Sequence, residues 1–486
     1  MISYAALQRP WPRPLFGAVR LLAVLGFVLI LGASHAHAQL QGRVGPTTST
    51  ASKRAAKVCN VLQYGGTASL TADIGPALSA AFAACKTGGT VYVPPGEYGM
   101  STWVSLSGGQ NWALQLDGVI YRTGTAGGNM IFIEKSKDFE LYSSTSQGAV
   151  QGNGYEFHKN NKNGCRILRL AHVQDFSIHD IALVDSPLFH LFLDTVSSGE
   201  VYNIIIRGGD KGGLDGLDVS GSNMWFHDLE VSNRDECVTI KNPAQYMLIE
   251  NIYCNWSGGC AMGSLSGGEN DIHHIHYDKV YSVNCNQMFM IKSNGGSGSV
   301  HDCSFTNFAG HHNAYTLNID ANWAQLKKQG GDGVLLRDLN FTGWHGSCSD
   351  GNRRGPVSVI CPPARPCYHL RLEDFAVWTE SGTHELYKCA NAYGEGACLR
   401  PDGSGAGAGA SAASAYSAYA ASTMTVATAP PGWSAPTMAA DLKTLPLSSS
   451  IPIPPVPTSF FPGATPYSKL LGGVAASASA AARVVR

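Results

Sequence analysis

The chain lacks an excess of charge of either sign. It has 486 residues, with 34 Lys+Arg against 35 Asp+Glu and a formal net charge of -1. Nucleic-acid-binding proteins are normally basic, so this balance argues against nucleic acid as a partner. Only 14% of the residues are charged, whereas 56 are glycine. Low charge with abundant Gly, Ser, Asn and Thr is typical of a β-rich extracellular protein with many tight turns.

Apolar runs long enough to span a bilayer are also missing. The longest run, at residues 21–31, is much shorter than the ~20 residues of a spanning helix. It follows three arginines and precedes Ala36-His37-Ala38, which has the small-x-small form of a cleavage site. This pattern predicts a signal peptide over residues 1–38, a secreted, extracellular mature chain, and no membrane association after the signal is removed.

The thirteen cysteines lack the CxxC…CxxC spacing of a zinc site, and we expect neither a metal nor a cofactor. In a secreted chain they imply disulfides, and the odd number leaves at least one thiol free. Short separations suggest the pairs Cys361 with Cys367 and Cys389 with Cys398. Two glycosylation sequons, at Asn255 and Asn340, are consistent with secretion.

A repeat of roughly 22–25 residues runs through the middle of the chain. Each copy pairs apolar residues with an Asp or Asn that precedes the next apolar residue, and the clearest interval, Trp225 to Leu248, is 23 residues. No copy contains the 10–15-residue amphipathic helix of a βαβ unit. Stacked copies would bury a continuous apolar interior, so the repeat predicts a β-solenoid. A helix-like spacing at residues 73–86 predicts a cap over one open end.

The composition changes near Pro401. Residues 403–421 are a Gly/Ala/Ser run, and residues 430–466 are rich in proline. Such a composition cannot bury a core of its own. We therefore expect a catalytic solenoid domain over residues 39–400 and a low-complexity, disordered tail over residues 401–486.

Four carboxylates and one lysine recur at similar phases of the repeat: Asp215, Asp218, Asp235, Glu236 and Lys292. Residues at the same phase of a solenoid lie above one another, so these side chains should line one groove. Hydrolysis of a glycosidic bond needs one carboxylic acid to protonate the leaving oxygen and one carboxylate to activate water or attack the sugar. Neighbouring carboxylates keep one of their number protonated, and a lysine can bind an acidic sugar.

Two candidate features of the site are open to more than one interpretation. Side chains alternate across a strand, so Asp235 and Glu236 should point to opposite faces unless a turn intervenes, and one of them can be structural. His311 follows an apolar repeat and is a candidate proton shuttle or substrate donor, although the chain has 16 histidines.

The motifs resemble those of glycoside hydrolase family 28. That family carries Asn-Thr-Asp-Gly-Phe-Asp, Gln-Asp-Asp-Cys, Gly-Gly-His-Gly and Arg-Ile-Lys in this order. Here the same positions read Gly-Leu-Asp-Gly-Leu-Asp at 213–218, Arg-Asp-Glu-Cys at 234–237, Gly-Gly-Cys-Ala at 258–261 and Met-Ile-Lys at 290–292. Cys260 replaces the histidine and Met290 the arginine, and both departures are similar to the rhamnogalacturonan hydrolase branch.

The resemblance implies an all-β fold, a single-stranded right-handed parallel β-helix. It also implies inverting hydrolysis of α-1,2 bonds between galacturonic acid and rhamnose. We predict endo action on the rhamnogalacturonan I backbone of pectin. Asp235 would be the general acid, Asp215 and Glu236 would hold the water with Asp218 beside them, and Lys292 would meet the galacturonate. We hypothesise that His311 fills the place of the missing histidine. The implied disulfides are Cys59–Cys85, Cys237–Cys254, Cys361–Cys367 and Cys389–Cys398.

Three alternatives differ in mechanism. A polygalacturonase or another pectin hydrolase would share the family's carboxylates. A β-helix lyase would use the acidic group to bind calcium and an arginine to abstract a proton. A carbohydrate-binding β-helix such as an adhesin would bind polymer without cleaving it. We expect the hydrolase, acting as a monomer with an acid and base roughly 6.5–9.5 Å apart, as inversion requires.

Overall fold

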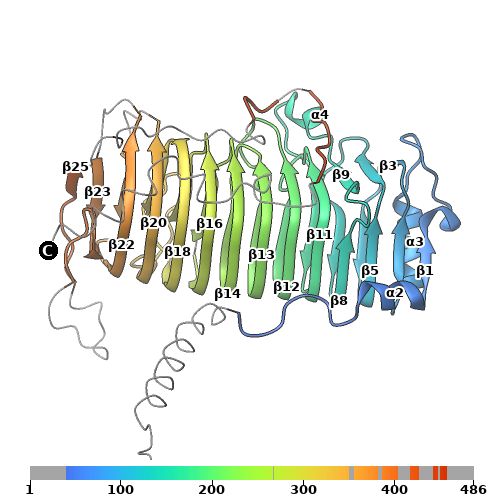
Figure 1. Ribbon diagram of the computed structural model, residues 1–486, viewed down its shortest axis with the longest axis horizontal. Helices are drawn as coiled ribbons and strands as arrows, with labels where there is room; N and C mark the ends of the chain where they lie inside the picture. The colour runs from blue at the N-terminus through green and yellow to red at the C-terminus, as the bar shows by residue number, and fades with distance from the viewer. Residues whose placement is uncertain are drawn as a thin grey trace, which may run out of the picture.

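The chain folds into a parallel β-helix, as the sequence predicts (Figure 1). The computed structural model describes residues 40–265, 267–349, 355–380, 386–402, 416–425, 429, 442–446 and 449–456. The predicted signal peptide lies outside the described residues. In the part that is described, no helix is long and apolar enough to cross a membrane.

One ladder of parallel strands, here called the front ladder, carries the acidic motifs. Its strands pair in the order β4 (Val104–Ser107), β7 (Asn129–Glu134), β10 (Arg166–Ala171), β12 (Leu191–Arg207), β13 (Leu217–Ser232), β14 (Glu236–Asn255), β15 (Gly259–Leu265), β17 (Gln287–Ser293), β19 (Tyr315–Asp320), β21 (Val357–Ile360) and β23 (Leu386–Ala390). In β12, β13 and β14 only the first residues belong to this ladder, because these long strands bend into the neighbouring face.

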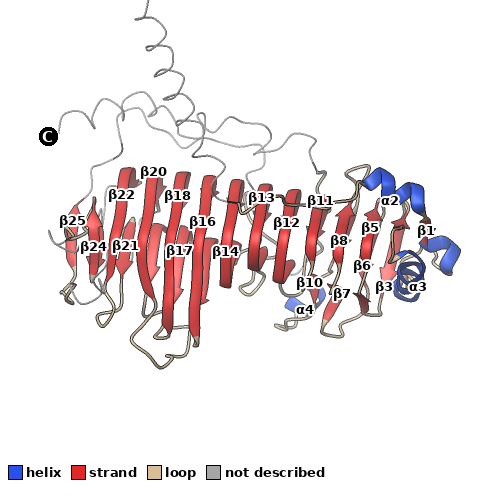
Figure 2. Ribbon diagram, turned by 90° about the horizontal axis from the view of Figure 1, so that it is seen from below, coloured by secondary structure: helices blue, strands red, loops and turns tan. Residues whose placement is uncertain are grey.

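The remaining strands close the other faces of each coil (Figure 2). They are β1 (Val58–Asn60), β2 (Thr90–Val93), β3 (Glu97–Met100), β5 (Gln110–Leu116), β6 (Val119–Arg122), β8 (Lys137–Tyr142), β9 (Ala149–Gln151), β11 (Gln174–Val184), β16 (Glu269–Val283), β18 (Ser297–Asn313), β20 (Leu335–Cys348), β22 (Cys367–Thr379), β24 (Ala392–Glu395) and β25 (Ser422–Thr425). Among these described strands, every pairing is parallel except that of β25 with β23.

Each repeat of the sequence is one coil of the helix. Trp225 in β13 pairs directly with Leu248 in β14, so the 23-residue interval is one turn around the axis. Inside the coils, equivalent apolar residues lie above one another: Leu168, Leu191, Leu217 and Val238. All four are at most 1% exposed. These stacks form the continuous interior that the repeat predicted.

The recurring Asp or Asn of the repeat marks a left-handed bend in each coil. Asp180, Asn203, Asp228 and Asn251 have φ of 58°, 49°, 55° and 55°. A non-glycine residue enters this region at a cost that is smallest for Asn and Asp, whose short polar side chains hydrogen-bond locally. The bend makes the strand turn from one face to the next, which explains why a polar residue recurs between two apolar ones.

Short helices cover the N-terminal end of the coils (Figures 1 and 2). They are the 3-10 helix η1 (Val61–Tyr64) and α3 (Gly75–Cys85), while α2 (Thr50–Ala56) lies along the side of the coils against β5 and β8. The α4 helix (Tyr155–His158) lies in a loop. The α3 helix occupies the predicted cap and buries Leu78, Ala81 and Phe82. Its last residue forms a disulfide with β1, one of four in the structure: Cys59–Cys85, Cys237–Cys254, Cys361–Cys367 and Cys389–Cys398.

The predicted disorder of the tail is wrong for the segments that the structure describes. Tyr416 is 6% exposed and stacks on Tyr368, and β25 covers the edge of β23. Further along, Ile451 and Val456 pack in one apolar cluster on the outside of the coils, against Ala149, Ala182 and Val184. A few widely spaced apolar residues make these contacts, and the average composition of the tail conceals them.

One tail segment also bears on the predicted glycosylation. Asn255 is fully buried, and its Oδ1 accepts a hydrogen bond from the Leu442 backbone N–H at 2.9 Å. A glycan has no room on this side chain, so the prediction at Asn255 is wrong for the folded chain. Asn340 is half-buried on β20 and remains a predicted site.

Candidate active site

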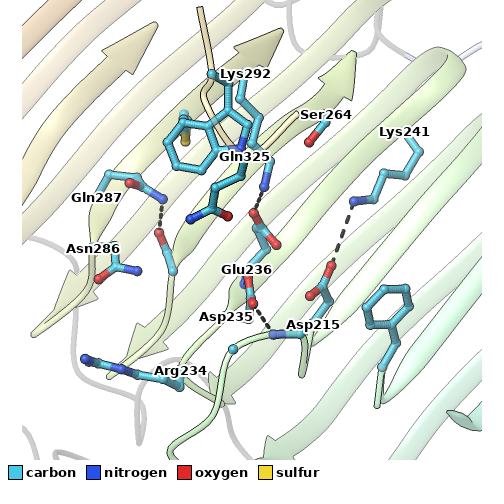
Figure 3. A pocket seen from close by; sticks show the side chains of 16 residues that line it. Asp215, Arg234, Asp235, Glu236, Lys241, Ser264, Asn286, Gln287, Lys292 and Gln325 are labelled. Atoms are coloured by element: carbon cyan, nitrogen blue, oxygen red, sulfur yellow. Dashed lines mark hydrogen bonds and ion pairs between the residues drawn. The ribbon is translucent and has the colours of Figure 1, made fainter. Parts of the chain in front are cut away.

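A polar cleft of about 570 Å³ opens on the front ladder (Figure 3). It lies where β13, β14, β15 and β17 follow one another. Its lining includes three of the four predicted carboxylates and the predicted lysine, together with several residues of neighbouring turns: Phe189, Gly212, Gly213, Asp215, Arg234, Asp235, Glu236, Lys241, Gly258, Ser264, Asn286, Gln287, Met290, Lys292, Trp323 and Gln325. The groove that the repeat predicted is therefore present.

Asp215 and Asp218 enter the site through a tight approach between two coils. Asp215 comes just before β13, and Asp218 is its second residue. A Cβ on Gly216, between them, would lie 2.6 Å from the Cys237 carbonyl oxygen of the next coil. Only glycine allows this approach, so the Asp-Gly-Leu-Asp motif combines two acids with the backbone that lets them face the next coil. Asp218 is 1% exposed and lies behind Asp215.

Asp235 and Glu236 both line the cleft, because a turn separates them. Arg234 has φ of 69°, and β14 begins only at Glu236. Asp235 thus belongs to the turn and Glu236 to the strand, which removes the strict alternation expected of a strand. Both oxygens of Asp235 accept backbone N–H groups: Oδ1 from Glu236 at 2.9 Å, and Oδ2 from Gly213. Oxygen atoms of Asp215, Asp235 and Glu236 lie within 4.8 Å of one another.

Two lysines balance three of the four carboxylates. Lys292 forms an ion pair with Glu236 and is 7% exposed, so it is not a solvated loop lysine. The Lys241 ammonium lies 3.2 Å from Asp218 and 3.8 Å from Asp215. Asp235 has no cation within salt-bridge distance in the described part of the chain. It is also the most accessible of the four carboxylates, since the others are at most 7% exposed.

The environment of Asp215 favours its protonated form. Burial raises the pKa of Asp215 well above its ordinary value, the negative charges of Asp218 and Asp235 raise it further, and Lys241 and Lys292 oppose the rise. Burial also raises the pKa of Asp218, against the opposing charge of Lys241. Such opposed influences among neighbouring carboxylates are typical of sites that move protons.

His311 is not among the residues that line the cleft, and its place in the reaction stays a prediction. Asp235 follows the end of β13. The equivalent positions on the next three coils are Asn255, Val283 and His311. Three strand spacings, roughly 14 Å, therefore separate His311 from the coil end that precedes Asp235. His311 instead places Nδ1 2.9 Å from the Tyr281 hydroxyl.

The two departures from the polygalacturonase motifs lie in different places. Cys260 is fully buried in the interior, 3.8 Å from the Cys254 sulfur. It is one of five buried free cysteines, the others being Cys165, Cys285, Cys303 and Cys348. Its position therefore leaves no gap in the cleft. Met290 does line the cleft and places an apolar side chain beside Lys292.

Several cleft residues carry no signal in the sequence. Lys241 lies five residues after Glu236, an odd separation for which strand alternation predicts opposite faces. The register irregularity between Glu236 and Thr239 offsets this alternation, and nothing in the sequence indicates it. Trp323 and Gln325 come from the loop after β19, and the Trp323 ring centroid is 5.8 Å from the Lys292 ammonium. Loop residues of this kind follow no repeat phase, so the repeat cannot place them.

The oxygens of the three clustered carboxylates are close enough to share one cation. Lys241 and Lys292 already supply two positive charges at this place. A divalent cation would have to compete with both ammonium groups, so the donor set fits a metal poorly. The chemistry that fits is proton transfer between carboxyl groups and a water or a leaving oxygen.

A parallel β-helix with clustered carboxylates in a groove on one face defines the class of carbohydrate-cleaving β-helix enzymes. A family model described as "Glycosyl hydrolases family 28" matches residues 114–398, more than half of the chain. The chain belongs to this family and is a glycoside hydrolase.

Individual relatives are similar over nearly the whole chain. A protein of Aspergillus fumigatus named "Probable rhamnogalacturonase B" is 56% identical over 469 residues, covering 96% of this chain and 87% of the relative. "Rhamnogalacturonase A" of Emericella nidulans is 54% identical over 475 residues, covering 96% and 90%. Among solved structures, the endo-xylogalacturonan hydrolase of Aspergillus tubingensis superimposes with a TM-score of 0.62 at 19% identity, covering 71% of this chain and all of that one. This likeness supports the fold alone.

Proposed function

We propose that the chain is a secreted endo-hydrolase that cleaves α-1,2 bonds between galacturonic acid and rhamnose in rhamnogalacturonan I. The observation that carries the proposal is the 54–56% identity, over nearly the whole chain, to relatives named rhamnogalacturonases. The cleft supports it with a lysine for a uronate and an apolar Met290 where the polygalacturonase motif has an arginine. A methyl-bearing deoxysugar is better accommodated beside methionine than beside a charged side chain.

In this proposal Asp235 protonates the glycosidic oxygen. It is the acid without a paired lysine in the described chain, and two backbone N–H groups orient it. Asp215 and Glu236 hold the attacking water, and Asp218 with Lys241 supports Asp215 from behind. Lys292 contacts both Glu236 and the uronate carboxylate. Protonation of the leaving oxygen and attack by water then occur on opposite sides of the sugar.

The carboxylate spacing is shorter than the separation predicted from the sequence. Nearest oxygens of the three acids lie within 4.8 Å, whereas inverting enzymes commonly separate their two carboxyl groups by about 6.5–9.5 Å. We retain inversion as the proposal because two carboxylates, Asp215 and Glu236, are available to hold one water. Proton NMR of the first product decides the point, since retention at the anomeric carbon contradicts this arrangement.

The experiment that tests the function compares substrates for the purified full-length protein. We expect size profiles of rhamnogalacturonan I to show internal cleavage, with little cleavage of homogalacturonan. Chelator should leave the rate unchanged, and the products should not absorb in the ultraviolet as unsaturated sugars do. Faster cleavage of homogalacturonan would favour a polygalacturonase. Unsaturated products whose formation is sensitive to chelator would favour a lyase. Binding of the polymer without cleavage would favour an adhesin.

A further inference from the structure

Two arginines lie on the outer face of the front ladder, N-terminal to the acids. Arg166 and Arg169 belong to β10, and both are half-buried. The Arg166 guanidinium carbon lies 5.1 Å from the ring centroid of Phe189 and 5.4 Å from that of Phe192. The Arg169 guanidinium carbon lies 5.2 Å from Phe192. Because Phe189 also lines the cleft, this cluster adjoins the active site directly.

The arginine pair carries more positive charge than its surroundings neutralise. Arg169 binds Asp194 at 2.8 Å, but Arg166 has no carboxylate within salt-bridge distance among the described residues. Burial lowers the pKa of Arg166, the charge of Arg169 lowers it further, and the charges of Asp218 and Asp215 oppose this. Holding two guanidinium groups together on one coil is unfavourable unless an anion joins them.

The rings beside the arginines form an apolar surface on the same face. The register aligns Phe132, Arg169 and Phe192 on consecutive coils, and Phe132 lies 5.1 Å from Arg169. The two phenylalanines are half-buried, so part of each ring faces solvent. Apolar and cationic side chains therefore alternate along the axis that leads to the acids.

We propose that Arg166, Arg169, Phe189 and Phe192 bind the polymer beyond the cleaved bond. The guanidinium groups take a uronate carboxylate, and the rings take the apolar face and methyl group of the neighbouring deoxysugar. From β10 to β14 is three strand spacings, roughly 14 Å, which only a chain of several sugars can bridge while it occupies the cleft. This inference rests on the proposed function and names the residues that make the enzyme prefer long, alternating substrates.

The test compares Arg166→Gln with the wild type on short and long oligosaccharides of alternating galacturonate and rhamnose. We expect kcat/KM on long chains to fall roughly 10- to 100-fold, as for the loss of a charge-assisted hydrogen bond, and to fall much less on the shortest cleaved substrate. On long chains whose carboxyl groups are chemically reduced, wild type and variant should become alike. Arg166→Lys should recover part of the loss, and Phe192→Leu should weaken binding of reduced chains too.

Arg371→Gln is the matched control, because Arg371 is exposed on β22, away from the front ladder. Equal rates of Arg166→Gln and wild type on long chains would overturn the proposal. So would an equal loss on short and long chains, which would mark a structural role, checked by thermal unfolding. If the wild type fails to cleave rhamnogalacturonan, the proposed function fails instead, independently of how the variants compare.

Discussion

Asp235 is held from two sides by backbone N–H groups and has no lysine beside it in the described chain. We expect Asp235→Asn to lower kcat by roughly 10²- to 10⁴-fold, the usual contribution of a general acid, with a small change in KM. Steady-state kinetics on rhamnogalacturonan measure both. Asp302→Asn, in a bend on another face, is the control and should keep full activity. An Asp235→Asn enzyme with normal turnover would remove Asp235 from the mechanism.

Lys241 lowers the pH at which the buried Asp215 loses its proton. Its positive charge lowers the pKa of Asp215 and Asp218, against the burial that raises both. Asp215 must be ionised to hold the water, so Lys241→Gln should shift the acidic limb of the kcat/KM profile to higher pH. Lys137→Gln, whose side chain is 56% exposed on β8, should leave the profile in place. An unchanged limb in Lys241→Gln would show that Asp215 is not the group that titrates.

At the scale of strands, rings stack across four coils outside the interior: Tyr142, His179, Tyr202 and His227. His227 lies 2.8 Å from Asp228 and 3.2 Å from Glu200. Although burial lowers the pKa of His227, its hydrogen bonds and the charges of both carboxylates raise it to about 9. The folded state therefore holds this proton more tightly than the unfolded state, whose histidine has a pKa of about 6.5.

Because of this difference in pKa, the stack of rings stabilises the fold to a degree that depends on pH. The stabilisation is complete below about pH 6.5 and is lost as the pH rises to about 9, in total about 3 kcal/mol. The urea midpoint of the wild type should fall across this range. His227→Gln should be less stable at pH 6.5 and should show a smaller fall, whereas His172→Asn, an exposed control, should behave like the wild type. Parallel pH profiles for all three proteins would contradict the assignment.

At the scale of the whole molecule, the sequence predicts best the features that belong to the repeat. The coil, the groove and the positions of Asp215, Asp235, Glu236 and Lys292 follow from the phase of the repeat, because equivalent residues stack. The role of His311 stays a prediction, because its motif gives no indication of how many coils separate it from the acids. The sequence did not predict Lys241, Trp323 or the arginine cluster as part of the site. The partners of these side chains depend on bends and loops, which have no period.

The tail is the largest difference between expectation and structure, and it reaches the active site. Leu442 accepts a hydrogen bond from Trp256 at 2.6 Å, and Pro446 accepts one from the Asp210 backbone N–H at 2.8 Å. A carboxylate oxygen of Asp210 lies 3.1 Å from the Arg234 guanidinium. Asp210 belongs to the same loop as Gly213, whose backbone N–H donates to Asp235. In Figure 1 the red tail segment lies beside α4, far along the axis from β25. Residues 442–446 and 449–456 thus tie this loop to the coils.

Ending the chain at residue 441 should therefore destabilise it and slow catalysis. Burial of the Ile451 and Val456 side chains favours folding by about 1.5–3 kcal/mol each, less the entropy of ordering the segment, so the urea midpoint should fall measurably. Turnover should fall as well, because the loop that orients Asp235 loses its Pro446 anchor. A chain ending at residue 456 keeps every tail contact described and should match the full-length protein. If the shorter chain equals the longer one in stability and turnover, the tail has no part in holding the site.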